Sequence, residues 1–76
     1  MTKNPGIHVT PRLDGRWNVI KEGAERASRV LDTQSEAARL GRESARSGNS
    51  EFFLHGRNGQ IRERDSYGRD PFPPKG

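Results

Sequence analysis

Residues 33–49, TQSEAARLGRESARSGN, decide the fold that the sequence predicts. Thr33 stands three residues before Glu36, the spacing at which the two side chains cap the first turn of a helix reciprocally. Gly48 and Asn49 together form a good C-terminal stop. We therefore expect one helix that begins after Thr33 and ends at Gly48.

The apolar face of this expected helix is built from small residues. They recur at spacings of three and four, which places them along one side, while charged residues occupy the other. The stripe comprises Ala37, Ala38, Leu40, Gly41, Ser44 and Ala45, and the water-facing side comprises Arg39, Arg42, Glu43 and Arg46. Such small residues indicate a helix that lies close against a sheet.

Three segments before the helix have strand character. Residues 7–11 (IHVTP) alternate apolar and polar side chains, and residues 16–22 (RWNVIKE) follow a turn at Asp14 and Gly15. Residues 26–32 (RASRVLD) indicate a third strand more weakly, because Ala, Ser and Arg have low strand preference. The three segments are typical of a meander.

Two further strands are expected after the helix. Residues 51–56 (EFFLHG) and 60–65 (QIRERD) flank an Asn-Gly pair, the strongest short-range signal for a β-hairpin. The element order is thus strand, strand, strand, helix, strand, strand. It predicts an α+β fold in which one helix packs on one face of a small antiparallel β-sheet.

Length and composition limit the chain to one small domain. It has 76 residues, of which 28% are hydrophobic, so burial barely offsets the chain entropy and the core is thin. We expect a flexible N-terminus at residues 1–6, the domain at 7–68, and a proline-rich extended tail at 69–76. No apolar run approaches the roughly 20 residues that cross a bilayer, and the N-terminus has no apolar signal core, so we expect a cytoplasmic protein without a membrane partner.

The absence of cysteine removes disulfides and thiolate metal sites as supports for this thin core. Self-association is the usual remaining support, so a homodimer is a natural expectation. The only histidines are His8 and His55, and a metal site would have to recruit carboxylates from scattered segments. We therefore expect no metal and no other cofactor.

Arginine dominates the basic residues. The chain has 14 lysines and arginines against 10 acids, a net charge of +4. Only Lys3, Lys21 and Lys75 are lysines. Guanidinium groups suit phosphates, carboxylates and aromatic faces, although a GC-rich coding sequence also favours arginine regardless of function.

A two-residue loop at 58–59 would fix which hairpin residues share a face, because directly opposed residues do. It places three pairs opposite each other: Arg57–Gln60, His55–Arg62 and Phe53–Arg64. The other face then holds Phe52, Leu54, Glu63 and Asp65, with Gly56 and Ile61 beside the turn. If the helix covers Phe52, Leu54 and Ile61, the open surface presents the candidate binding residues Phe53, His55, Arg57, Arg62 and Arg64.

This combination of rings and guanidinium groups supports three interpretations. The leading functional hypothesis is a nucleic-acid or nucleoprotein surface, where arginines pair with phosphates and rings stack on unpaired bases. The second is a homodimer or other protein interface, since both residue types are enriched there. The third is purely structural: Phe53 belongs to the core, and arginine stems cover it or pair with neighbouring acids.

The C-terminal segment DPFPPKG is a second candidate binding element. A preformed extended segment can lie across a groove on a partner or fold back over its own sheet, and the alternative is a frayed terminus. The residues concerned are Phe72, Pro73 and Pro74.

Catalysis finds little support. Glu63 and Asp65 share a predicted face, but ion pairing with the surrounding arginines is the commoner role for such acids. Ser66 and Tyr67 lack a histidine-bearing constellation. Trp17 alternates with Val19 and is expected in the core. So short a chain has no apolar residues left for a pocket, so we expect neither an enzyme nor a small-molecule substrate.

Several stretches together resemble a known family. They are IHVTPRLDGRWNVIKEGAERASRVLDTQSEA at residues 7–37, HGRNGQIRERDSYG at 55–68 and DPFPPKG at 70–76. The chain resembles, from about Ile7 to its end, the short bacterial proteins catalogued as domain of unknown function 2188. The resemblance implies a small β-rich fold with one helix, and it assigns no activity and no site residue.

Overall fold

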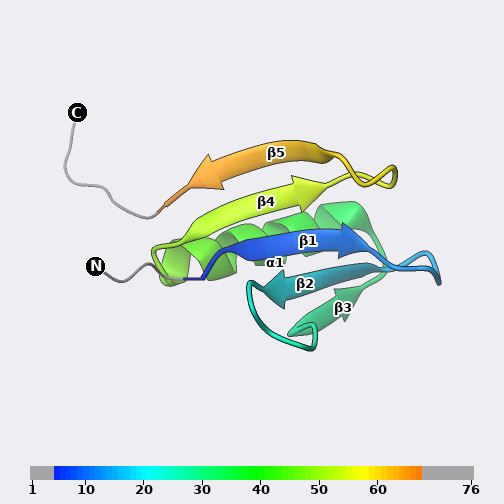
Figure 1. The fold of residues 1–76 in the computed structure, drawn as a ribbon, viewed down its shortest axis with the longest axis horizontal. Coiled ribbons are helices and arrows are strands. Elements are labelled where there is room, and N and C mark those ends of the chain that lie inside the picture. Colours follow the sequence, from blue (N-terminus) through cyan, green and yellow to red (C-terminus); the bar gives the residue numbers. More distant parts are fainter. Residues whose placement is uncertain (1–4, 68–76) are drawn as a thin grey trace.

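The computed structural model describes residues 5–67, which form one helix and a five-stranded sheet (Figure 1). In chain order the elements are β1 (Ile7–Pro11), β2 (Trp17–Lys21), β3 (Arg29–Leu31), α1 (Gln34–Ser47), β4 (Glu51–His55) and β5 (Ile61–Ser66). The predicted α+β class and element order are confirmed. The predictions for residues 1–4 and for the tail, including Phe72, Pro73 and Pro74, lie outside the described residues.

Both predicted ends of α1 are confirmed. The Thr33 hydroxyl accepts a hydrogen bond from the backbone N–H of Glu36 at 3.2 Å, which satisfies one of the free donors of the first turn. At the other end, the Gly48 N–H donates to the carbonyl of Ser44 at 3.0 Å. With 14 residues, α1 falls short of what a membrane-spanning helix needs, and the rest of the described chain offers no other candidate.

The sheet is mostly antiparallel and contains one parallel pair. Its strand order is β3-β2-β1-β4-β5, and β1 pairs with β4 in parallel, with Ile7 opposite Phe52. No local pattern predicts this pair, because it depends on α1, which returns the chain so that β4 enters beside β1 in the same direction. β3 is only three residues long, shorter than the expected 26–32.

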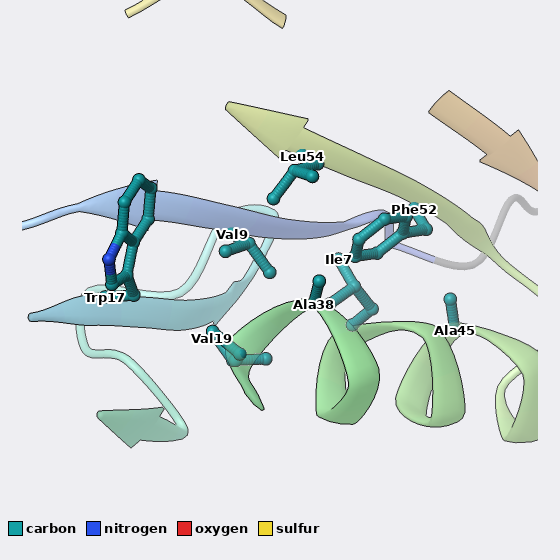
Figure 2. Packing of buried hydrophobic residues seen from close by; sticks show 9 residues of the cluster. Ile7, Val9, Trp17, Val19, Ala38, Ala45, Phe52 and Leu54 are labelled. Carbon is teal, nitrogen blue, oxygen red and sulfur yellow. The ribbon is translucent and has the colours of Figure 1, made fainter. Parts of the chain in front are cut away.

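The core lies between α1 and the face of the sheet that it covers. Side chains of β1, β2 and β4 point toward the helix, where they meet its small residues (Figure 2). The buried hydrophobic residues are Ile7, Val9, Trp17, Val19, Ala37, Ala38, Ala45, Phe52 and Leu54. Trp17 is therefore a core residue as expected, while Ser44, expected in the helix stripe, is exposed.

Gly41 sets how closely α1 approaches the sheet. A Cβ atom at this position would lie 2.8 Å from Cε1 of Phe52 and 3.0 Å from Cγ2 of Val9. Phe52 and Val9 are both fully buried. A methyl group at Gly41 would therefore force the helix away from the middle of the sheet.

Gly41→Ala is expected to destabilise the protein by about 1–3 kcal/mol, the usual cost of overpacking a core. This is the opposite of an exposed helix position, where alanine is about 1 kcal/mol better than glycine. Thermal or urea unfolding measures the change. The matched control, Ser44→Ala on an exposed position of α1, should leave the melting temperature unchanged or slightly raised. A Gly41→Ala protein as stable as the wild type would contradict the close packing.

Candidate interaction surface

The β4–β5 hairpin has a three-residue loop in place of the expected two-residue loop. The Gly56 N–H donates to the carbonyl of Gln60 at 2.7 Å, and the Gly59 N–H donates to the carbonyl of Gly56 at 2.9 Å. Gly59 has a φ of 87°, whereas Asn58 does not have a positive φ. A type I′ turn needs positive φ at both central residues. The prediction that Arg57 faces Gln60 is therefore wrong.

A β-bulge corrects the register one step further along the hairpin. His55 lies opposite Ile61, while Leu54 lies opposite Glu63, so Arg62 is the extra residue on β5. The longer loop moves the register by one residue and the bulge moves it back. Phe53 consequently faces Arg64 as predicted.

The bulge exchanges the predicted places of Ile61 and Arg62. Ile61 shares the face of His55, away from α1, and is 53% exposed. Arg62 turns toward the helix, where its Nη1 donates to Oε1 of Gln34 at 3.2 Å. The predictions that Arg62 faces His55 and that the helix covers Ile61 are both wrong.

The face of the sheet opposite α1 is covered by no described element (Figure 1). We call it the open face. Alternation along the strands and the strand registers define its members. They are His8, Thr10, Asn18, Ile20, Val30, Glu51, Phe53, His55, Ile61, Arg64 and Ser66. Val30 and Ile61 are the large aliphatic side chains that this face exposes, at 39% and 53%.

Three rings from β1 and β4 stack at the centre of the open face. The ring centroids of His8 and Phe53 are 4.6 Å apart with an interplanar angle of 18°. Those of His8 and His55 are 5.2 Å apart at 28°. A hydrogen bond of 3.0 Å joins Nδ1 of His8 to Nε2 of His55. We refer to His8, Phe53 and His55 as the ring cluster.

Neighbouring groups hold the ring cluster in place. The guanidinium carbon of Arg64 lies 5.9 Å from the ring centroid of Phe53, on the β5 side, while His8 contacts Phe53 from β1. Glu22 places Oε2 at 3.7 Å from Nε2 of His8, and its Oε1 accepts a hydrogen bond from the backbone N–H of Gly6 at 3.0 Å. A nucleobase could stack on Phe53 only by displacing His8 or Arg64.

Arg57 lies with Arg62 on the other side of the sheet. Its guanidinium carbon is 4.8 Å from the ring centroid of Trp17, and its Nη2 donates to the carbonyl of Gly15 at 3.1 Å. The five candidate residues are therefore divided. The structure brings Phe53, His55 and Arg64 together on the open face, and it places Arg57 and Arg62 near the start of α1.

The two acids of β5 pair with the helix. Arg42 contacts Glu63 through Nη2, and its Nε lies 3.4 Å from Oδ2 of Asp65. This agrees with the ion-pair interpretation of these acids and explains why Arg42, expected to face water, is partly buried.

The candidate site predicted from the sequence did not include His8. Its place on the polar side of residues 7–11 was evident, but its contact with Phe53 and His55 depends on the parallel pairing of β1 with β4. Pairing of distant parallel strands leaves no local signal comparable with a turn or a helix cap.

His55 has a lowered pKa. Its partial burial disfavours the charged imidazolium, and the nearby charge of His8 lowers the pKa further from the ordinary 6.5. The folded protein therefore keeps His55 neutral at pH values where the unfolded chain protonates it.

The free energy of unfolding should consequently fall as the pH drops below 6.5, the ordinary pKa of histidine in the unfolded chain. Above that pH, His55 should no longer lower the stability. Urea unfolding in metal-free buffer between pH 7.5 and pH 5 measures the slope. In His55→Gln, which retains a donor for His8, the slope should be shallower. Parallel profiles for the two proteins would contradict the assignment.

Comparison with known proteins gives one match. A family model described as "Uncharacterized protein conserved in bacteria (DUF2188)" matches residues 7–67. Neither the curated proteins nor the solved structures contain a significant match. The matched range runs from the first residue of β1 to just past β5, so it covers every element of the fold. The chain therefore belongs to the uncharacterised bacterial family DUF2188.

Proposed function

We propose that the open face is a protein-interaction surface and that its partner is a second copy of this chain, which makes the protein a non-enzymatic assembly module. The observation that carries the proposal is a sheet face that bears the ring cluster together with exposed Val30 and Ile61, and that no described element covers. Val30 and Ile61 lie on opposite edge strands with the ring cluster between them, and an uncovered face that combines rings with aliphatic side chains is typical of an interaction site.

The charges of the open face favour a protein partner over a nucleic acid. Among its members Arg64 carries a permanent positive charge and Glu51 a negative one. Beside them Arg12 donates to Asn18 and pairs with Asp14, and Glu22 lies against His8, so acids and arginines balance on and around this face. Nucleic-acid binding depends on several cations that neutralise phosphates. Arg57 and Arg62, which would have supplied them, lie on the other side of the sheet.

A second copy is the occupant that matches this mixture of charges. In a two-fold symmetric interface the same patch meets itself. If one residue of the first copy contacts a second residue of the other copy, the reverse contact is also made. Arg64 of one copy can then face Glu51 of the other, twice in each dimer. Because Glu51 and Arg64 are diagonal neighbours on β4 and β5, the two ion pairs lie beside each other near the two-fold axis and leave no net charge from these residues at the interface.

The size of the face indicates a weak dimer. Five strands at about 4.8 Å spacing and about 17 Å length give a flat area of about 400 Å². A standard stable interface buries about 800 Å² on each partner. We therefore expect association in the micromolar range or weaker.

Sedimentation velocity from about 10 µM to about 1 mM, the range that such a weak interface requires, tests the proposal. The wild type should shift from monomer to dimer. Ile61→Asp on the open face should raise the dissociation constant about tenfold or more, because each dimer buries the new carboxylate twice. The matched control is Leu13→Asp at the β1–β2 turn, where the side chain is fully exposed. It should leave the dissociation constant unchanged.

A wild-type protein that stays monomeric throughout this range would overturn the proposal. So would a Leu13→Asp protein that dissociates as readily as Ile61→Asp. If the monomer instead binds single-stranded oligonucleotides with a salt dependence that Arg64→Ala reduces, the open face is a nucleic-acid surface and the assembly proposal is wrong.

A further inference from the structure

An open pocket lies between the turn of the β4–β5 hairpin and the start of α1. It has a volume of about 480 Å³ and is lined by Trp17, Asp32, Thr33, Gln34, Arg57 and Arg62. The bulge in β5 places Arg62 on this side of the sheet, where it joins Arg57. We call this the arginine pocket, and none of its residues belongs to the open face.

The two arginines of the pocket contact neutral oxygens. Nη2 of Arg57 donates to the carbonyl of Gly15 at 3.1 Å, and Nη1 of Arg62 donates to Oε1 of Gln34 at 3.2 Å. Among residues 5–67 neither guanidinium forms an ion pair with an acid. A guanidinium has five N–H donors, so these two bonds leave most of the donors for a ligand.

The acid that lines the pocket already has a partner. Oδ1 of Asp32 lies 3.4 Å from Nε of Arg16, so the charges of these two residues offset each other. The charges of Arg57 and Arg62 therefore have no compensating acid in the pocket. Two like charges that share one pocket repel each other, and an anion between them relieves this repulsion.

Contacts with the fold hold both arginine side chains. The guanidinium carbon of Arg57 lies 4.8 Å from the ring centroid of Trp17, which is buried in the core. The stem of Arg62 passes so close to Gly56 that a Cβ atom there would lie 3.1 Å from Cδ of Arg62. Side chains that are held in this way lose less entropy on binding than unsupported surface arginines do.

We propose that Arg57 and Arg62 together bind the dianion of a phosphate monoester in the arginine pocket. The planar fork of a guanidinium matches the oxygens of a phosphate group. A monoester carries a charge of about −1.5 to −2 at pH 7, which balances two guanidinium groups, whereas a carboxylate or a phosphodiester carries only one charge. The Thr33 hydroxyl already caps α1, so the arginines and not the end of the helix carry the recognition.

The pocket is open to solvent, so the group that bears the phosphate can extend away from the protein. A liquid water molecule takes about 30 Å³, and about 480 Å³ therefore holds a phosphate group with several bound waters. Both a small phosphate compound and a phosphorylated side chain of a protein present this chemistry. The experiment below distinguishes the two sources.

Fluorescence of Trp17, the only tryptophan of the chain, reports on the pocket because Arg57 lies against its ring. The titration uses inorganic phosphate at constant ionic strength and a protein concentration at which sedimentation shows a monomer, so its outcome is independent of self-association. Phosphate should change the fluorescence in a saturable way. Dimethyl phosphate, a singly charged diester, should bind about fivefold more weakly, because it carries one charge less.

Arg62→Gln should weaken phosphate binding about tenfold, the usual effect of a lost hydrogen bond to a charged group. Arg62→Lys keeps the charge but loses the planar fork, so its affinity should lie between those of the wild type and Arg62→Gln. The matched control is Arg46→Gln in the last turn of α1. It removes the same charge at the other end of the helix and should bind phosphate as the wild type does.

Nitrogen-15 spectra of the arginine Nε–H groups provide a readout that needs no variant. Phosphate should shift the signals of Arg57 and Arg62 and should leave that of Arg46 in place. A short phosphoserine peptide that binds more tightly than inorganic phosphate would identify a phosphorylated protein as the source. Equal affinity would identify a small phosphate compound, and either result supports the site.

The proposal is overturned if phosphate shifts the signals of Arg57 and Arg62 no more than chloride does at the same ionic strength. It is equally overturned if Arg46→Gln weakens phosphate binding as much as Arg62→Gln does.

Discussion

The parallel pairing of β1 with β4 is the contact on which the rest of the structure depends. It sets Ile7 beside Phe52 and Val9 beside Leu54 on one face, and His8 beside Phe53 on the other. The first two pairs form the middle of the core beneath α1. Because side chains alternate along a strand, the same pairing that builds the core also assembles the ring cluster on the opposite face.

The two faces of the sheet differ because the described chain has one helix to cover them. Gly41 lets α1 lie close against the large side chains of the covered face, and Arg57 and Arg62 lie on that same side of the sheet. The open face keeps rings, aliphatic groups and few charges. This division of the arginines is the reason that we propose a self-complementary protein contact, and not a nucleic acid, for the open face.

Local signals in the sequence predicted the parts of the fold that local interactions determine. Thr33 and Gly48 mark the two ends of α1, because helix caps act within one turn of the helix. The pairing of Phe53 with Arg64 was also predicted. This predicted pairing is correct although the predicted loop length is wrong, because the bulge at Arg62 compensates for the extra loop residue. The places of Ile61 and Arg62 were wrong because the backbone angle of Asn58 selects between two loops that the same Asn-Gly pair permits.

The His8–His55 contact could not be found in the same way, because the two residues are 47 positions apart and meet only through strand order. A nuclear Overhauser spectrum of the aromatic protons tests this arrangement most directly. We predict cross-peaks from the His8 ring to the rings of both Phe53 and His55. Cross-peaks that connect β1 to β5 instead, with none between His8 and Phe53, would contradict the strand order on which both the core and the open face rest.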